Sequence, residues 1–163
     1  MKRKSEGWGF VALIALGAAI AASGCGTSAL RTQTQTHLVT TGVVATAGET
    51  IDAARTEQLD AAMEAHPPGP ERNAALDEIH AAWRPVGAAL DSIRDLLIAW
   101  AEGLELAAIA NVRDLSWESF THIIARIVLL YDDIARMTNS LGVEALPELP
   151  GVLRGLATIP GGR

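Results

Sequence analysis

The chain has 163 residues and a formal net charge of −6; 49% of its residues are hydrophobic and only 4% are aromatic. This length accommodates one domain with a buried core, and the acidic balance argues against a nucleic-acid partner and against adhesion to anionic lipid headgroups. The abundance of alanine and the scarcity of aromatic residues favour helices over sheets.

The N-terminus has the pattern of a secretory signal. Lys2, Arg3 and Lys4 make it basic, and residues 10–22 then run without a charge. This stretch is too short to span a bilayer, which needs about 20 apolar residues, but it suits the apolar region of a signal peptide. The sequence therefore predicts a signal peptide over residues 1–24; a short buried helix of the mature chain is the alternative.

The segment ASGC, residues 22–25, ends in Cys25, the only cysteine of the chain. Small residues before a cysteine, behind an apolar stretch, resemble the lipobox of bacterial lipoprotein precursors. The resemblance covers the first 25 residues only. It implies cleavage after Gly24 and attachment of a diacylglyceryl group to Cys25 as a thioether, for which a thiolate is the nucleophile. The family usually has leucine at the position of Ala22, so cleavage by the ordinary signal peptidase, without lipidation, stays an alternative.

The resemblance also implies where the protein is held. A lipid on Cys25 would anchor the chain, because two acyl chains already hold a protein stably. Gly26, rather than aspartate, follows the cysteine, which implies the outer membrane, facing the periplasm, in a bacterium that has two membranes. Without residues 1–24, 10 basic and 18 acidic residues remain, which gives a charge of −8. The expected membrane contact is therefore the lipid rather than a basic surface.

Behind the cysteine we expect a tether and then a first helix. Residues 25–37 are polar and rich in threonine, which indicates a flexible tether; a segment that frays into the first helix is the close alternative. The segment HPPGP, residues 66–70, must end a helix, because three prolines within four residues cannot continue one. Between them a helix is predicted over 38–65, where apolar residues recur on one face: Val44, Ile51, Leu59 and Ala62.

Two further helices are predicted from apolar residues that lie three and four apart. In residues 71–110 these residues form a seam of five heptads: Leu76, Ile79, Trp83, Val86, Leu90, Ile93, Leu97, Trp100, Leu104 and Ala107. A third helix, with Asp114 or Ser116 as its N-cap, carries the same spacing at Phe120, Ile123, Ile127, Leu130, Ile134, Met137 and Leu141. We therefore predict an all-α fold, an elongated antiparallel three-helix bundle over residues 38–141, followed by a proline- and glycine-rich tail over 142–163.

Few side chains are arranged for chemistry. Asp77 and His80 lie three apart on the second helix, and Glu118 and His122 lie four apart on the third. Dimetal sites in bundles need Glu-x-x-His on two helices and two more glutamates, which these pairs do not supply. We predict surface or boundary histidines, with no metal and no cofactor. No catalytic residue is expected either, because no nucleophile-elbow motif is present.

One feature departs from a simple amphipathic pattern. Ile98, Leu106 and Ile109 lie opposite the seam of the second helix, interleaved with Glu102 and Glu105. A helix that is apolar on both sides is covered by something else. We expect the C-terminal tail, a second copy of the chain, or an envelope protein partner to pack against these apolar side chains. These five residues are the candidate interaction face.

The hypothesis that follows is a non-enzymatic, membrane-anchored envelope lipoprotein whose helical bundle is a spacer or a protein-interaction module. One alternative is a protein that binds a small apolar ligand between its helices; a weaker one is a metalloprotein built on the two carboxylate–histidine pairs. Phage-type envelope lipoproteins, including the outer spanins of lysis systems, share the lipobox and a short extracytoplasmic chain. Nothing after Cys25 favours that family specifically.

Overall fold

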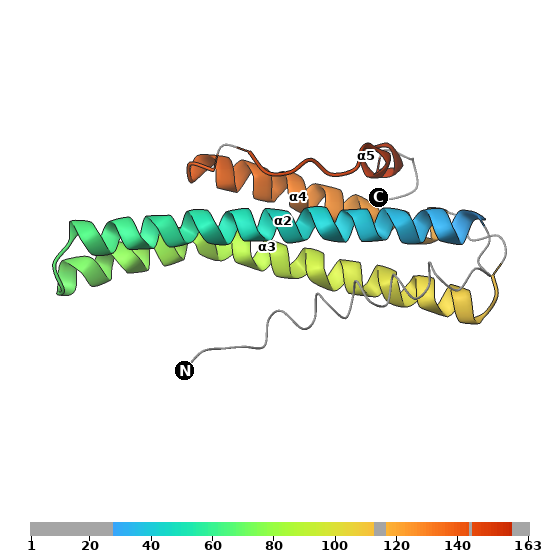
Figure 1. Cartoon of the computed structure of the whole chain (residues 1–163), viewed down its shortest axis with the longest axis horizontal. Coiled ribbons are helices and arrows are strands. Elements are labelled where there is room, and N and C mark those ends of the chain that lie inside the picture. Colours follow the sequence, from blue (N-terminus) through green and yellow to red (C-terminus); the bar gives the residue numbers. More distant parts are fainter. Residues whose placement is uncertain (1–27, 113–116, 144, 158–163) are drawn as a thin grey trace. The chain divides into compact units, whose positions relative to one another are not determined.

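The computed structural model describes residues 28–112, 117–143 and 145–157, and every regular element in these ranges is helical (Figure 1). The elements are α2 (Ser28–Ala65), α3 (Pro70–Ile109), the 3₁₀ helix η1 (Trp117–Phe120), α4 (Thr121–Ser140) and α5 (Gly151–Ala157). Helices α2, α3 and α4 correspond to the three helices expected from the sequence. The predicted all-α bundle is confirmed.

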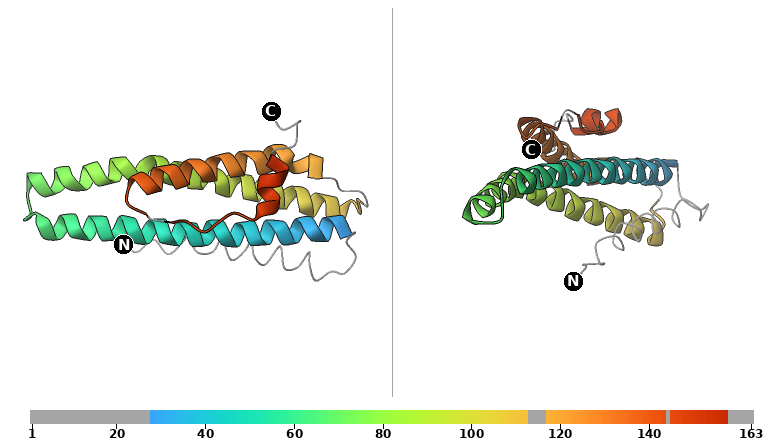
Figure 2. Two further views of the ribbon diagram at one scale, coloured as in Figure 1. Left: turned by 90° about the horizontal axis from the view of Figure 1, so that it is seen from above. Right: turned by 60° about the vertical axis from the view of Figure 1, so that its left-hand side comes forward.

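The chain divides into two compact units, and the three long helices contribute to both. Of the described residues, unit 1 comprises 28–42, 94–112, 117–128 and 149–157, and unit 2 comprises 43–93, 129–143 and 145–148. Within each unit the α2 and α3 segments lie side by side and run in opposite directions (Figures 1 and 2). Each unit therefore contains its own antiparallel helix pair.

From Trp83 to Ala107 the seam predicted for the second helix is the buried face of α3, whereas its first two residues, Leu76 and Ile79, are half-buried. Trp83 and Val86 are buried in unit 2, and Leu97, Trp100 and Leu104 are buried in unit 1. Apolar residues spaced three and four apart fall on one side of a helix, so their burial follows from the 3.6-residue period. Helix α3 continues through Pro85, whose side chain is exposed.

The tether expected over residues 25–37 is wrong from Ser28 onward, because α2 begins there. The threonine hydroxyls donate hydrogen bonds to carbonyls one turn back: Thr34 to Leu30 at 2.9 Å and Thr40 to Thr36 at 2.7 Å. Such bonds satisfy the hydroxyls within the helix, at a small cost in helix stability. Residues 25–27 lie outside the described residues.

A short turn joins α2 to α3 in unit 2. The proline-rich segment ends α2 at Ala65, as the sequence predicts, and Pro70 opens α3, where a missing N–H costs nothing. Arg72 reaches back and donates hydrogen bonds to the carbonyls of His66 at 2.7 Å and Met63 at 2.8 Å. These carbonyls lie at the end of α2 and would otherwise lack a partner in the helix.

Gln58 connects three segments of unit 2. Its side-chain carbonyl accepts a hydrogen bond from the Trp83 indole N–H at 2.8 Å, and its amide donates to the Leu141 carbonyl at 2.7 Å. Tyr131 donates its hydroxyl hydrogen bond to the Pro147 carbonyl at 2.5 Å. These bonds fix α2, α3, the end of α4 and the chain that follows it.

Helices α3 and α4 end in the same way. In α3 the N–H groups of Asn111 and Val112 donate to the carbonyls of Ala108 and Ala107, and Asn111 has a φ of 52°. This is the Schellman arrangement, in which a residue in the left-handed conformation turns the chain and satisfies the last carbonyls. In α4 the left-handed residue is Gly142, with a φ of 88°, which glycine adopts without strain.

The third predicted helix has the expected buried face but a different start. Asp114 and Ser116, the expected N-caps, lie outside the described residues, and the 3₁₀ helix η1 precedes α4. Four of the seven predicted positions are buried and the other three are half-buried. The tail is not one long helix, as predicted; it contains the short helix α5, and its Leu149 and Leu153 are buried in unit 1.

Candidate functional site

The residues predicted to carry the membrane anchor, Cys25 and Gly24, lie outside the described residues, as does the whole signal segment 1–24. The first described residue, Ser28, is three positions after the cysteine and already belongs to α2. Within the described ranges, none of the helices has the length and apolar content that crossing a membrane requires. Any lipid on Cys25 would therefore be joined almost directly to a folded helix.

The candidate interaction face lies at the surface of α3 in unit 1. Ile98 is 41% exposed, Leu106 67% and Ile109 74%, while Glu102 is exposed and Glu105 half-buried between them. The described tail does not cover these three apolar side chains. A second copy of the chain and an envelope protein are therefore the two remaining candidates for a partner that binds this face.

The centre of unit 1 is a polar patch that the sequence reasoning missed. Gln33, Thr34, His37, Thr40 and Thr41 of α2 are all buried, although all but the last two fall in the segment expected to be a tether. Their spacing of one, three, three and one is the period of a helix face. This spacing indicates a buried helix face in the sequence, although the residues that show it are polar rather than apolar.

His37 anchors this patch to α3. Its Nε2 lies 3.0 Å from the Leu97 carbonyl oxygen, so Nε2 carries the hydrogen and donates it. Its ring meets Trp100 edge-on, with the centroids 5.1 Å apart and the planes at 90°. This geometry fits the preferred edge-to-face contact of aromatic rings. Burial lowers the pKa of His37 below its ordinary value of 6.5, and the hydrogen bond to Leu97 opposes this in part.

We expect His37 to make the protein less stable as the pH falls. Because its folded-state pKa lies below 6.5, the unfolded chain takes up a proton first, and stability decreases from about pH 6.5 downward. One proton changes the free energy of unfolding by at most about 1.4 kcal/mol per pH unit. Urea unfolding of wild type and His37→Gln between neutral and mildly acid pH measures this. Equal pH dependence of the two proteins would show that His37 contributes nothing to it.

A close approach between α3 and η1 completes this core. A Cβ atom on Gly103 would lie 2.6 Å from Cε1 and 3.2 Å from Cζ of the buried Phe120 ring. Phe120 in turn lies 6.4 Å from Trp100 between ring centroids. The glycine therefore provides the space in which the Phe120 ring reaches the tryptophan.

Gly103→Ala is expected to destabilise the protein. Overpacking a core costs about 1–3 kcal/mol, which exceeds the gain of about 1 kcal/mol from replacing a helical glycine by alanine. Gly87→Ala is the matched control, because no atom outside the adjacent backbone lies within 4 Å of its added Cβ. It should raise the midpoint of urea unfolding, whereas Gly103→Ala should lower it. A higher midpoint for both variants would contradict the packing described here.

The two carboxylate–histidine pairs are arranged as follows. In unit 2, Nδ1 of the exposed His80 lies 3.0 Å from Nη2 of Arg55, and because arginine only donates, Nδ1 accepts this bond. That nitrogen is thereby occupied. In unit 1, Glu118 and His122 are both exposed. Among the described residues no group of three or more histidine, cysteine, aspartate or glutamate side chains is placed to hold a metal ion.

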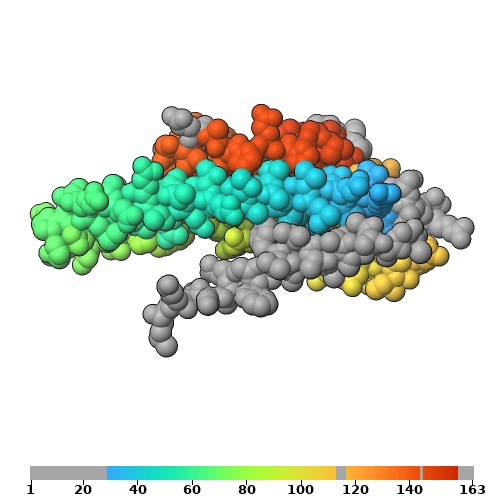
Figure 3. All heavy atoms as spheres, viewed as in Figure 1, coloured from blue at the N-terminus to red at the C-terminus, as the bar shows by residue number. Residues whose placement is uncertain are grey.

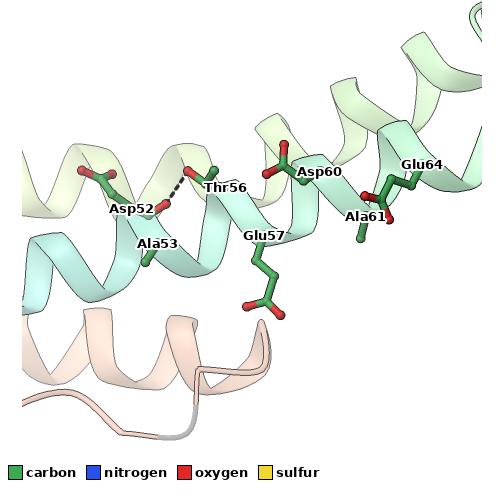
Figure 4. Close-up of a pocket in the computed structure, with 7 residues that line it drawn as sticks. All are labelled: Asp52, Ala53, Thr56, Glu57, Asp60, Ala61 and Glu64. Carbon is green, nitrogen blue, oxygen red and sulfur yellow. Dashed lines mark hydrogen bonds between the residues drawn. The ribbon is translucent and has the colours of Figure 1, made fainter.

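A shallow depression of about 760 Å³ lies along α2 in unit 2 (Figure 4). Four of the seven residues around it are acidic: Asp52, Glu57, Asp60 and Glu64. The Thr56 hydroxyl donates its hydrogen bond to the Asp52 carbonyl at 2.8 Å, within the helix. An open and acidic surface of this kind does not suit the small apolar ligand considered from the sequence.

No family model matches the chain, and neither does any curated protein or solved structure.

Proposed function

We propose that the protein is a non-enzymatic envelope lipoprotein, anchored by acyl chains on Cys25 and exposing a helical bundle that serves as a spacer or interaction module. The observation that carries the proposal is the N-terminal pattern: a basic start, an uncharged stretch over residues 10–22, and the sole cysteine directly behind small residues. These are the parts of a lipoprotein signal. The exposed apolar residues of α3 support an interaction role for the bundle.

The start of α2 is consistent with a short connection to the membrane. Ser28 is three positions after Cys25, and even a fully extended chain over that distance spans only about 11 Å. Two or more acyl chains hold a protein stably at a bilayer. The bundle would thus be confined close to the membrane surface, and its effective concentration toward neighbouring envelope proteins would be raised accordingly.

Fractionation of cells that make the full chain tests this proposal. We expect the protein in the membrane fraction, resistant to high salt because its attachment is apolar and its mature charge of −8 does not favour anionic headgroups. Nonionic detergent should release it. In a bacterium with two membranes it should accompany the outer membrane. Recovery in the soluble fraction without detergent would contradict the proposal and favour a secreted domain.

A further inference from the structure

The start of α2 and the end of α3 lie at the same end of unit 1 (Figures 1 and 2). His37 of α2 contacts Leu97 and Trp100 of the antiparallel α3. Ser28 lies nine residues before His37 in α2, and Ile109 lies nine residues after Trp100 in α3. Nine residues cover about 14 Å along either helix. Along the axis of the helix pair, the last turn of α3 therefore lies beside the first turn of α2, which begins three positions after Cys25.

This end of α3 carries the two most exposed large apolar side chains among the described residues. They are Ile109 at 74% and Leu106 at 67%, and Val112, at 39%, adds a third. The end of α3 is the yellow surface in Figure 3. No charged residue occurs in residues 106–112. Arg113 and Asp114, which follow in the sequence and lie outside the described residues, have opposite charges.

We propose that Leu106, Ile109 and Val112 insert into the headgroup–acyl boundary of the bilayer that holds Cys25. The inference rests on the proposed lipid at Cys25. Because Cys25 can be at most about 11 Å from Ser28, the lipid holds this end of unit 1 within reach of the interface, where apolar side chains are buried about 5–10 Å deep. The lipid and the end of α3 then form two attachments and orient unit 1 on the membrane.

Part of the backbone at this end is already hydrogen-bonded. An unsatisfied carbonyl is costly in a bilayer, but the carbonyls of Leu106, Ala107 and Ala108 accept hydrogen bonds from the N–H groups of Ala110, Val112 and Asn111. Glu102 and Glu105 lie four residues before Leu106 and Ile109, about 6 Å farther from this end along the helix, and mark the level at which the proposed contact meets water. A contact made by apolar side chains alone should not depend on anionic lipid.

Site-specific labelling of the lipidated protein tests the proposal. The Cys25 thiol is consumed by the thioether, so a cysteine introduced by Ile109→Cys is the only one that reacts with a polarity-sensitive fluorophore. Ile98→Cys is the matched control, since Ile98 is the same residue type on the same helix, about 16 Å farther from the proposed interface. Both proteins are reconstituted in phosphatidylcholine vesicles that contain a nitroxide-labelled lipid.

We expect quenching at position 109 to exceed quenching at position 98 at least about threefold, because nitroxide quenching requires near contact and the two positions are about 16 Å apart. Equal quenching at both positions, while the protein stays on the vesicles, would overturn the inference and leave the lipid anchor intact. A label at position 109 that is shielded from water but not quenched by the lipid would also overturn it, because a protein partner then covers this face.

The double variant Leu106→Glu with Ile109→Glu gives a second readout. Both side chains are exposed, so helicity by circular dichroism should be unchanged, whereas the quenching of a label at Val112→Cys in this background should fall to the level of position 98. Unchanged quenching would contradict insertion of these side chains. Failure of the proposed function is recognised separately, because the fluorophore would then react with Cys25 of the wild-type chain.

Discussion

Replacing Trp100 by alanine should lower the free energy of unfolding by about 3–5 kcal/mol, the range measured for loss of a large aromatic side chain from a core. Trp100 is fully buried and contacts the His37 ring on one side and Phe120 on another. A domain of this size is stable by only about 5–15 kcal/mol. Urea unfolding followed by circular dichroism should therefore show a large shift of the midpoint.

Trp100→Phe is the control for this variant. It retains an aromatic ring against His37 and Phe120, and it removes an indole N–H that is buried with no hydrogen-bond partner among the described residues. Losing an unsatisfied donor does not destabilise the folded state, so phenylalanine should cost less than half as much as alanine. Equal losses for the two variants would contradict the packing described for unit 1.

Replacing Cys25 by serine should abolish lipidation completely. Serine has a hydroxyl instead of a thiol, so the diacylglyceryl thioether cannot form. We expect the precursor to keep residues 1–24 and to carry no acyl mass, which intact-protein mass spectrometry measures directly. Thr27→Ser, two positions after the cysteine, is the control and should be processed and acylated like wild type. A Cys25→Ser protein that is cut and membrane-bound like wild type would contradict the assignment of Cys25.

The seam of α3 was predictable because a single physical signal carries it. Apolar residues repeat every three and four positions from Leu76 to Ala107, and burial of that face follows from helix geometry whatever the rest of the chain does. The exposure of Ile98, Leu106 and Ile109 follows for the same reason, because all three fall outside the seam; their role in an interaction stays a prediction.

The start of α2 was not predictable from the same signals. Threonine lowers helix propensity, and residues 25–37 contain four threonines but little apolar content, so a tether was favoured there over an extension of the first helix. Its helix is stabilised by tertiary contacts that the sequence alone does not reveal, above all the bond between His37 and the Leu97 carbonyl, 60 residues away. Tertiary packing commonly overrides local propensity in this way.

The mass of the N-terminal peptide of the mature wild-type protein tests the lipid anchor most directly. Arg31 is the first basic residue after the cysteine, so trypsin should release residues 25–31 as one peptide. We predict that this peptide begins with Cys25 and carries the added mass of a diacylglyceryl group. A peptide that begins at Cys25 with a free thiol, or one that extends back into residues 1–24, would contradict the assignment of this protein as a lipoprotein.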